Sequence, residues 1–176
     1  MILGCVLAGG LSTRFGSDKA LAEIDGHSLL ARAVDALSGW CERVVVAGRE
    51  VAPAPTIPDW PRAGMGPLGG IAAALRLARD EGFEAVLTCG VDSLWLPEDL
   101  PERLAPAPAF LDGQPVVGLW PASAAGAIEA ILLAEGRHSM RQFAQAIGAR
   151  AVNIAGEPAN INTPQDLAQA EKRDGF

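Results

Sequence analysis

Apolar and polar positions along the chain follow two patterns, one typical of buried strands and the other of amphipathic helices. Largely apolar runs at Ile2–Leu7, Arg43–Ala47 and Ala85–Cys89 predict three buried parallel strands. Pro115–Trp120 and Ala151–Ile154 predict two more strands. These runs are spread over the whole chain, so the segments between them decide the fold class.

The intervening segments carry apolar residues at helical spacing. Ser28–Leu37 places its apolar residues on one stripe, which predicts a helix. Pro67 and Gly82 are placed to begin and end a second helix. Thr163–Asp166 combines an N-cap threonine, a first-turn proline and an acid three residues after the cap, which predicts a last helix. Further helices are expected at Pro97–Leu104, Ala127–Leu133 and Met140–Ile147.

Strand and helix predictions alternate for nearly the whole length, which favours a three-layer α/β/α sandwich with a mostly parallel sheet. The Pro-rich segments Val51–Pro61 and Leu104–Pro108 are too short for interdomain linkers and are expected to be loops. The length of 176 residues fits one domain, so residues 1–176 are expected to form a single domain. Because ligands of such sheets bind at the carboxyl ends of the strands, functional residues are expected directly after strands.

Composition and charge narrow the function classes. The net charge of −7 argues against a nucleic-acid partner, which needs a cationic surface. No apolar run approaches the roughly 20 residues of a membrane span, and no basic segment precedes the first apolar run, so a cytoplasmic protein without a membrane partner is expected. Cys5, Cys41 and Cys89 are far apart and odd in number, and we interpret them as small core residues.

The segment after the first predicted strand, residues 7–19, is the first candidate site. Gly9 and Gly10 bring bare backbone N–H groups within reach of phosphate oxygens, while Arg14 and Lys19 supply positive charge. The two glycines alone would favour a simple tight turn, but the combination with two cations favours a triphosphate. The P-loop spacing is absent, and the dinucleotide fingerprint at Gly64–Gly69 has no strand before it.

Several segments together resemble a known family. Leu7–Lys19 resembles the signature loop of nucleotidyltransferases with a glycosyltransferase-A-like fold. Gly66–Ile71, Asp92 after a strand, and Asn160–Leu167 narrow the resemblance to the molybdenum cofactor guanylyltransferases. Members of that family transfer GMP from GTP to molybdopterin and release pyrophosphate. The resemblance runs in order from Leu3 to Ala170, and it implies an enzyme with GTP and molybdopterin as substrates.

The loop and the resemblance together imply a set of site residues. Arg14 and Lys19 are expected on the phosphates, and Asp92 is expected to bind Mg²⁺, the implied cofactor. These three are the expected catalytic residues, and Asp59 is expected to contact the base. Asn160 and Asn162 are expected on the acceptor side, although both could instead order the turn before the last helix. The full nucleotide site is expected to comprise Leu7, Ala8, Gly9, Gly10, Arg14, Lys19, Asp59, Gly66 and Asp92.

Two departures from the family pattern keep other functions open. The family usually has Cys-Asp-x-Pro at the metal site, whereas residues 90–94 are Gly-Val-Asp-Ser-Leu. A nucleotide-binding module that has lost catalysis is therefore one alternative. Asp92 could also cap the helix expected near Pro97 in place of binding a metal. Residues 47–49 are Ala-Gly-Arg and lack an asparagine that the family often has near the base, so a cytidylyltransferase acting on molybdopterin or another phosphorylated acceptor is the second. Transient contact with proteins that deliver or accept the cofactor is also left open.

Overall fold

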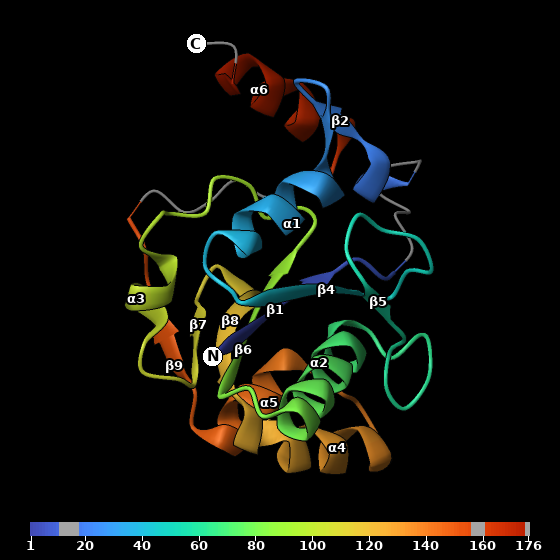
Figure 1. The fold of residues 1–176 in the computed structure, drawn as a ribbon, viewed down its shortest axis with the longest axis vertical. Helices are drawn as coiled ribbons and strands as arrows, with labels where there is room; N and C mark the ends of the chain where they lie inside the picture. Colours follow the sequence, from blue (N-terminus) through green and yellow to red (C-terminus); the bar gives the residue numbers. More distant parts are fainter. Residues whose placement is uncertain (11–17, 156–160, 175–176) are drawn as a thin grey trace.

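A seven-stranded sheet runs through the centre of the computed structural model, which describes residues 1–10, 18–155 and 161–174 (Figure 1). The strands are β1 Ile2–Leu7, β4 Arg43–Ala47, β5 Thr56–Ile57, β6 Ala85–Gly90, β7 Ala109–Leu111, β8 Gln114–Pro121 and β9 Arg150–Val152. Their order in the sheet is β5-β4-β1-β6-β8-β7-β9. Among these strands, β8 runs antiparallel to both of its neighbours, and the other pairings are parallel. The prediction of a mostly parallel sheet is confirmed.

Helices cover both faces of the sheet. Helices α1 (Leu29–Ser38) and α3 (Leu100–Leu104) pack on one face, and α2 (Pro67–Glu81), α4 (Ala125–Leu133) and α5 (Met140–Ile147) pack on the other. Because successive strand side chains point to opposite faces, β1 contributes Val6 to the first core and Leu3 and Cys5 to the second. The predicted α/β/α sandwich is therefore confirmed, and Cys5 is a buried core residue as interpreted.

A small third cluster extends the molecule beyond the sheet. The two-residue strands β2 (Glu23–Ile24) and β3 (His27–Ser28) form a hairpin, and helix α6 (Pro164–Asp174) lies beside it (Figure 1). Ile24, Leu29 and Ile161 are buried together there with Leu94 and Ala170. This cluster fixes the C-terminal segment next to the residues that follow β6.

The helix signals of the sequence act as expected. Ser28 caps α1 by accepting a hydrogen bond from the backbone N–H of Ala31, at 3.1 Å. Helix α2 begins at Pro67 and ends before Gly82, which adopts a left-handed φ of 81°. The backbone N–H of Asp166 donates to Thr163 Oγ1 at 3.2 Å, which forms the predicted cap of α6.

Some boundaries differ from the predictions. Helix α3 begins at Leu100 and not at Pro97, because the backbone N–H of Leu100 bonds to the Pro97 carbonyl and closes a separate turn. Helix α4 begins at Ala125, and β9 ends at Val152. The loop expected at Val51–Pro61 contains β5, which pairs with the end of β4. Within the described residues, no helix combines the length and the apolar character needed to span a bilayer.

Candidate nucleotide-binding site

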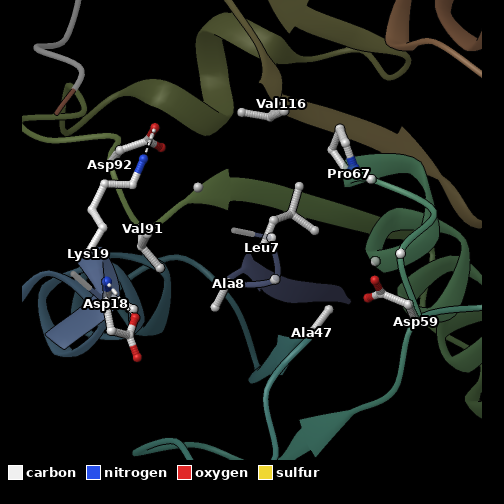
Figure 2. Close-up of a pocket in the computed structure, with 17 residues that line it drawn as sticks. Leu7, Ala8, Asp18, Lys19, Ala47, Asp59, Pro67, Val91, Asp92 and Val116 are labelled. Carbon is white, nitrogen blue, oxygen red and sulfur yellow. Dashed lines mark hydrogen bonds and ion pairs between the residues drawn. The ribbon is translucent and has the colours of Figure 1, made fainter. Parts of the chain in front are cut away.

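A cavity of about 520 Å³ opens at the carboxyl ends of β1, β4 and β6 (Figure 2). This is the edge of the sheet at which ligands of such folds bind, and the volume lies in the range of small-molecule sites. Its walls come from the ends of these strands, from the start of α2 and from β8. The lining residues are Leu7, Ala8, Gly9, Gly10, Asp18, Lys19, Ala20, Ala47, Asp59, Gly64, Gly66, Pro67, Gly70, Gly90, Val91, Asp92 and Val116.

The cavity gathers most of the residues that the sequence singled out. Leu7 to Gly10, Lys19, Asp59, Gly66 and Asp92 all line it. Asn162 is not among the lining residues, and its backbone N–H donates to Asp166 Oδ2 at 3.0 Å. Arg14 and Asn160 lie outside the described residues. The expected role of Asn162 on the acceptor side stays a prediction.

Opposite charges meet at one end of the cavity. Lys19 Nζ donates to Asp92 Oδ2 at 3.1 Å, and the two side chains are 19% and 21% exposed. Lys19 begins a short 3₁₀ turn (Lys19–Leu21), whereas Asp92 follows β6, so the pair joins segments 73 residues apart. Figure 2 shows Asp59 at the opposite end, with Leu7 and Ala8 between. The cavity is therefore polar at both ends and lined by backbone and small apolar side chains between them.

The end of β6 is shaped to present Asp92. A Cβ placed on Gly90 would lie 2.5 Å from Asp92 Oδ1, so only glycine leaves room for the carboxylate in this position. The backbone N–H of Ser93 donates to the Gly90 carbonyl, and the N–H of Ile161 donates to the Asp92 carbonyl. Backbone bonds on both sides thus hold the main chain of Asp92 at the edge of the cavity.

Asp92 has the donor chemistry of a Mg²⁺ ligand. Mg²⁺ is held in nucleotide enzymes by one or two carboxylates together with substrate phosphates and waters. Within the described residues, no group of three or more His, Cys, Asp or Glu side chains could enclose a metal ion. The carboxylate of Asp92 therefore fits a Mg²⁺ ion that also takes oxygens from a bound polyphosphate.

Asp59 occupies a half-buried position at the other end. Its carboxylate lies against the first turn of α2, where a Cβ on Gly69 would be 3.2 Å from the Asp59 Cβ. Burial raises the pKa of Asp59 above the ordinary value for aspartate, because desolvation disfavours the charged form. A half-buried carboxylate at the start of a helix is suited to accept hydrogen bonds from a ligand.

Three buried polar side chains, which the sequence analysis did not identify, connect β6 to β8. Ser93 Oγ donates to Gln114 Oε1 at 2.9 Å, next to Asp92. Thr88 Oγ1 donates to the Val116 carbonyl at 2.6 Å and accepts from the indole N–H of Trp120 at 2.9 Å. The position of Ser93 beside Asp92 was a usable signal, but Gln114 comes from a hairpin that sequence spacing does not place there. These bonds join β6 and the residues directly after it, among them Asp92, to the strand β8 that carries Val116.

Gly48, which the sequence analysis also passed over, brings the end of β4 against the end of β1. Its φ is 86°, and a Cβ there would lie 2.6 Å from Gly9 Cα and 2.7 Å from Gly9 N. We expect Gly48→Ala to destabilise the fold by more than the roughly 1–3 kcal/mol of left-handed strain, because two backbone segments must also separate. Urea unfolding measures the change.

Gly26 provides the matched control for Gly48→Ala. It has a similar φ of 78°, but nothing lies within 4 Å of a Cβ built on it. Gly26→Ala therefore carries the backbone strain without the clash. Equal losses of unfolding free energy in the two variants would contradict the proposed close packing of Gly48 on Gly9.

Comparison with known proteins agrees with this geometry. Residues 4–152 match the family described as MobA-like NTP transferase domain. The chain is 38% identical to the molybdenum cofactor guanylyltransferase of Rhodobacter capsulatus, covering 98% of this chain and 96% of that protein. It is also 38% identical to the molybdenum cofactor guanylyltransferase of Acidiphilium cryptum (strain JF-5), covering 94% and 92%.

A solved structure shares the fold. The molybdopterin-guanine dinucleotide biosynthesis protein A from Archaeoglobus fulgidus matches with a TM-score of 0.74 and 21% identity, covering 99% of each chain. The family match, the near full-length relatives and the shared fold agree with one another. The chain therefore belongs to the MobA-like NTP transferase family.

Proposed function

We propose that this chain is a Mg²⁺-dependent guanylyltransferase that transfers GMP from GTP to molybdopterin and releases pyrophosphate. The observation that carries the proposal is the cavity at the carboxyl edge of the sheet, with Lys19 and Asp92 at one end and Asp59 at the other. The names of relatives 38% identical over almost the whole chain support the same reaction and do not favour the cytidylyl alternative. The chain is expected to act as a single domain.

The two ends of the cavity suggest how GTP lies in it. The triphosphate is placed toward Lys19, which supplies positive charge in an otherwise acidic protein. The base is placed toward Asp59. Guanine has a ring N–H and an adjacent amino group, two neighbouring donors that match the two oxygens of an ionised carboxylate. Cytosine has one amino donor and an acceptor next to it, so a carboxylate at this position favours GTP over CTP.

The reaction needs alignment and charge neutralisation more than proton transfer. A phosphate oxygen of molybdopterin attacks the α-phosphorus, the bond between the α-phosphorus and its bridging oxygen breaks, and pyrophosphate leaves. The attacking oxygen is already ionised, so no general base is required. Lys19 neutralises charge that grows on the leaving pyrophosphate, and the N–H groups of Gly9 and Gly10 contribute further donors. Asp92 would hold a Mg²⁺ ion, which supplies additional charge neutralisation on the phosphates.

The test is pyrophosphate release with a panel of nucleoside triphosphates, molybdopterin and either Mg²⁺ or a chelator. Release with GTP that requires both Mg²⁺ and molybdopterin is expected. Release with CTP in preference to GTP would contradict guanylyl transfer and support the cytidylyl alternative. Nucleotide uptake without release of pyrophosphate would contradict catalysis and support a binding module.

The pH dependence of GTP binding tests the role of Asp59. The carboxylate accepts from guanine only when ionised, and its raised pKa means that it is protonated at a higher pH than an ordinary aspartate. Protonation of Asp59 is therefore expected to lower GTP affinity as the pH falls through that pKa, in addition to any loss from protonation of the terminal phosphate of GTP. Asp59→Asn is expected to weaken GTP binding by about tenfold and to remove the part of the acid-side loss that Asp59 causes. Calorimetry between about pH 4 and 7 measures both effects.

Two controls keep the Asp59 result specific. Asp35 is an exposed aspartate on α1, and Asp35→Asn is expected to leave both the GTP affinity and its pH dependence unchanged. ITP lacks the amino group of guanine, so Asp59→Asn should weaken ITP binding less than GTP binding. An equal loss for GTP and ITP would show that Asp59 does not contact the amino group.

A further inference from the structure

Two neighbouring residues after β4, Gly48 and Arg49, contact two separate segments that line the cavity. Gly48 packs directly on the backbone of Gly9, because a Cβ on Gly48 would lie 2.6 Å from Gly9 Cα. Arg49 binds Asp18, the residue that precedes Lys19. The loop after β4 therefore ties the end of β1 to the residue next to Lys19, although these segments are separate in the sequence.

The contact between Arg49 and Asp18 has the geometry of a rigid pair. Arg49 Nη1 donates to Asp18 Oδ1 at 3.0 Å, and Nη2 donates to Oδ2 at 2.9 Å, so both carboxylate oxygens are bound by one planar fork. The Arg49 side chain is 19% exposed. Hydrogen bonding from Arg49 lowers the pKa of Asp18, so the carboxylate stays ionised at neutral pH.

Asp18, whose side chain is held by Arg49, also holds the backbone next to Lys19. Its Oδ1 also accepts from the backbone N–H of Ala20 at 3.2 Å and caps the 3₁₀ turn that begins at Lys19. The backbone of Lys19 is therefore held between a side chain fixed by Arg49 and the turn that follows. A lysine side chain is long and flexible, so the placement of its amine depends on how firmly its backbone is fixed.

We propose that Arg49, acting through Asp18, is a positioning residue that holds Lys19 at the phosphate end of the cavity. Arg49 itself does not line the cavity, whereas Asp18 does. The inference rests on the proposed function, since it assigns Lys19 to the phosphates of GTP. It adds a residue pair whose role is to fix geometry and not to touch the nucleotide.

Arg49 could instead bind phosphate directly, and this role predicts an opposite change in GTP affinity for Asp18→Asn. If Arg49 bound phosphate directly, Asp18 would be a competing carboxylate beside an anionic ligand, and Asp18→Asn would leave GTP binding unchanged or strengthen it. If Arg49 acts through Asp18, the same variant loses the fork and weakens GTP binding. The direction of the Asp18→Asn effect therefore separates positioning from direct contact.

The test is calorimetric titration of the full chain with GTP and Mg²⁺. Arg49→Ala and Asp18→Asn are each expected to raise the Kd for GTP by about tenfold, with the binding stoichiometry unchanged. The double variant should be no weaker than either single variant, because both remove the same contact. Arg49→Lys keeps the charge but not the fork, and is expected to lie between wild type and Arg49→Ala.

Several results would overturn the inference. Asp18→Asn with unchanged or tighter GTP binding would do so, and so would losses that add in the double variant. A fall in stoichiometry at an unchanged Kd would show that the pair supports only folding. Arg103→Ala is the control, since it removes an exposed arginine–aspartate pair away from the cavity, with Asp99, and should leave the Kd unchanged. A wild-type chain that takes up no nucleotide would instead overturn the proposed function.

Discussion

Lys19→Ala is expected to lower the turnover number for GMP transfer by about 10²–10³-fold, the typical cost of removing one donor that stabilises charge in a transition state. Lys19 lines the cavity, and its amine lies at the end of the cavity toward which the triphosphate is proposed to lie. The substitution removes no buried core contact, so the unfolding free energy should change little. Steady-state pyrophosphate release and urea unfolding measure the two quantities.

The chain offers a matched lysine for this experiment. Lys172 is exposed on α6, away from the cavity residues, and Lys172→Ala is expected to leave turnover unchanged. Lys19→Arg keeps the positive charge with a different shape and should recover part of the lost turnover. Turnover of Lys19→Ala equal to that of wild type would refute the assignment of the phosphate end.

Helices and strands could be predicted from the sequence where their burial shows as a local pattern of apolar residues. The bounds of β1, β4 and α5 match the sequence predictions to the residue, because each segment shows its burial as a continuous or periodic apolar pattern. Strands β5 and β7 were missed. They have two and three residues, and they are strands only because neighbouring strands pair with them, which no local pattern records.

The residues of the candidate site also fall into those that the sequence predicted and those that it did not. The family resemblance marks Lys19, Asp59 and Asp92 as site residues. Lys19 and Asp92 also lie in segments that follow predicted strands. All three residues line the cavity. Arg49 was named only as part of a segment lacking asparagine, and its partner Asp18 was not singled out. Their contact joins residues 31 apart, so it depends on how β4 lies beside β1. Sequence spacing finds residues that face a ligand, but it does not find residues that hold them.

Asp92→Ala is expected to lower turnover by about 10²–10³-fold, because it removes both the proposed Mg²⁺ ligand and the partner of Lys19. Asp92→Asn separates these two roles. Its amide oxygen can still accept a hydrogen bond from Lys19, but it carries no charge and is a weaker ligand for Mg²⁺. If Asp92 binds the metal, the asparagine variant should lose nearly as much turnover as the alanine variant and should need more Mg²⁺ for half-maximal activity.

The control for Asp92→Asn is Asp99→Asn, which neutralises an exposed aspartate shortly after the same strand and outside the cavity. It should change neither turnover nor the Mg²⁺ requirement. An Asp92→Asn variant with wild-type turnover at low Mg²⁺ would mean that Asp92 only orients Lys19.

Because Lys19 and Asp92 form an ion pair, the effects of substituting them are not expected to be independent. The effect of removing one side chain of the pair depends on whether the other is present. Removing Asp92 alone removes the ion pair with Lys19, and removing Lys19 alone leaves the Asp92 carboxylate facing the phosphates without the Lys19 amine beside it. The double variant Lys19→Ala with Asp92→Ala should therefore lose less turnover than the product of the two single losses. Losses that multiply exactly would indicate that the two side chains act independently, and steady-state kinetics of the three variants measures the difference.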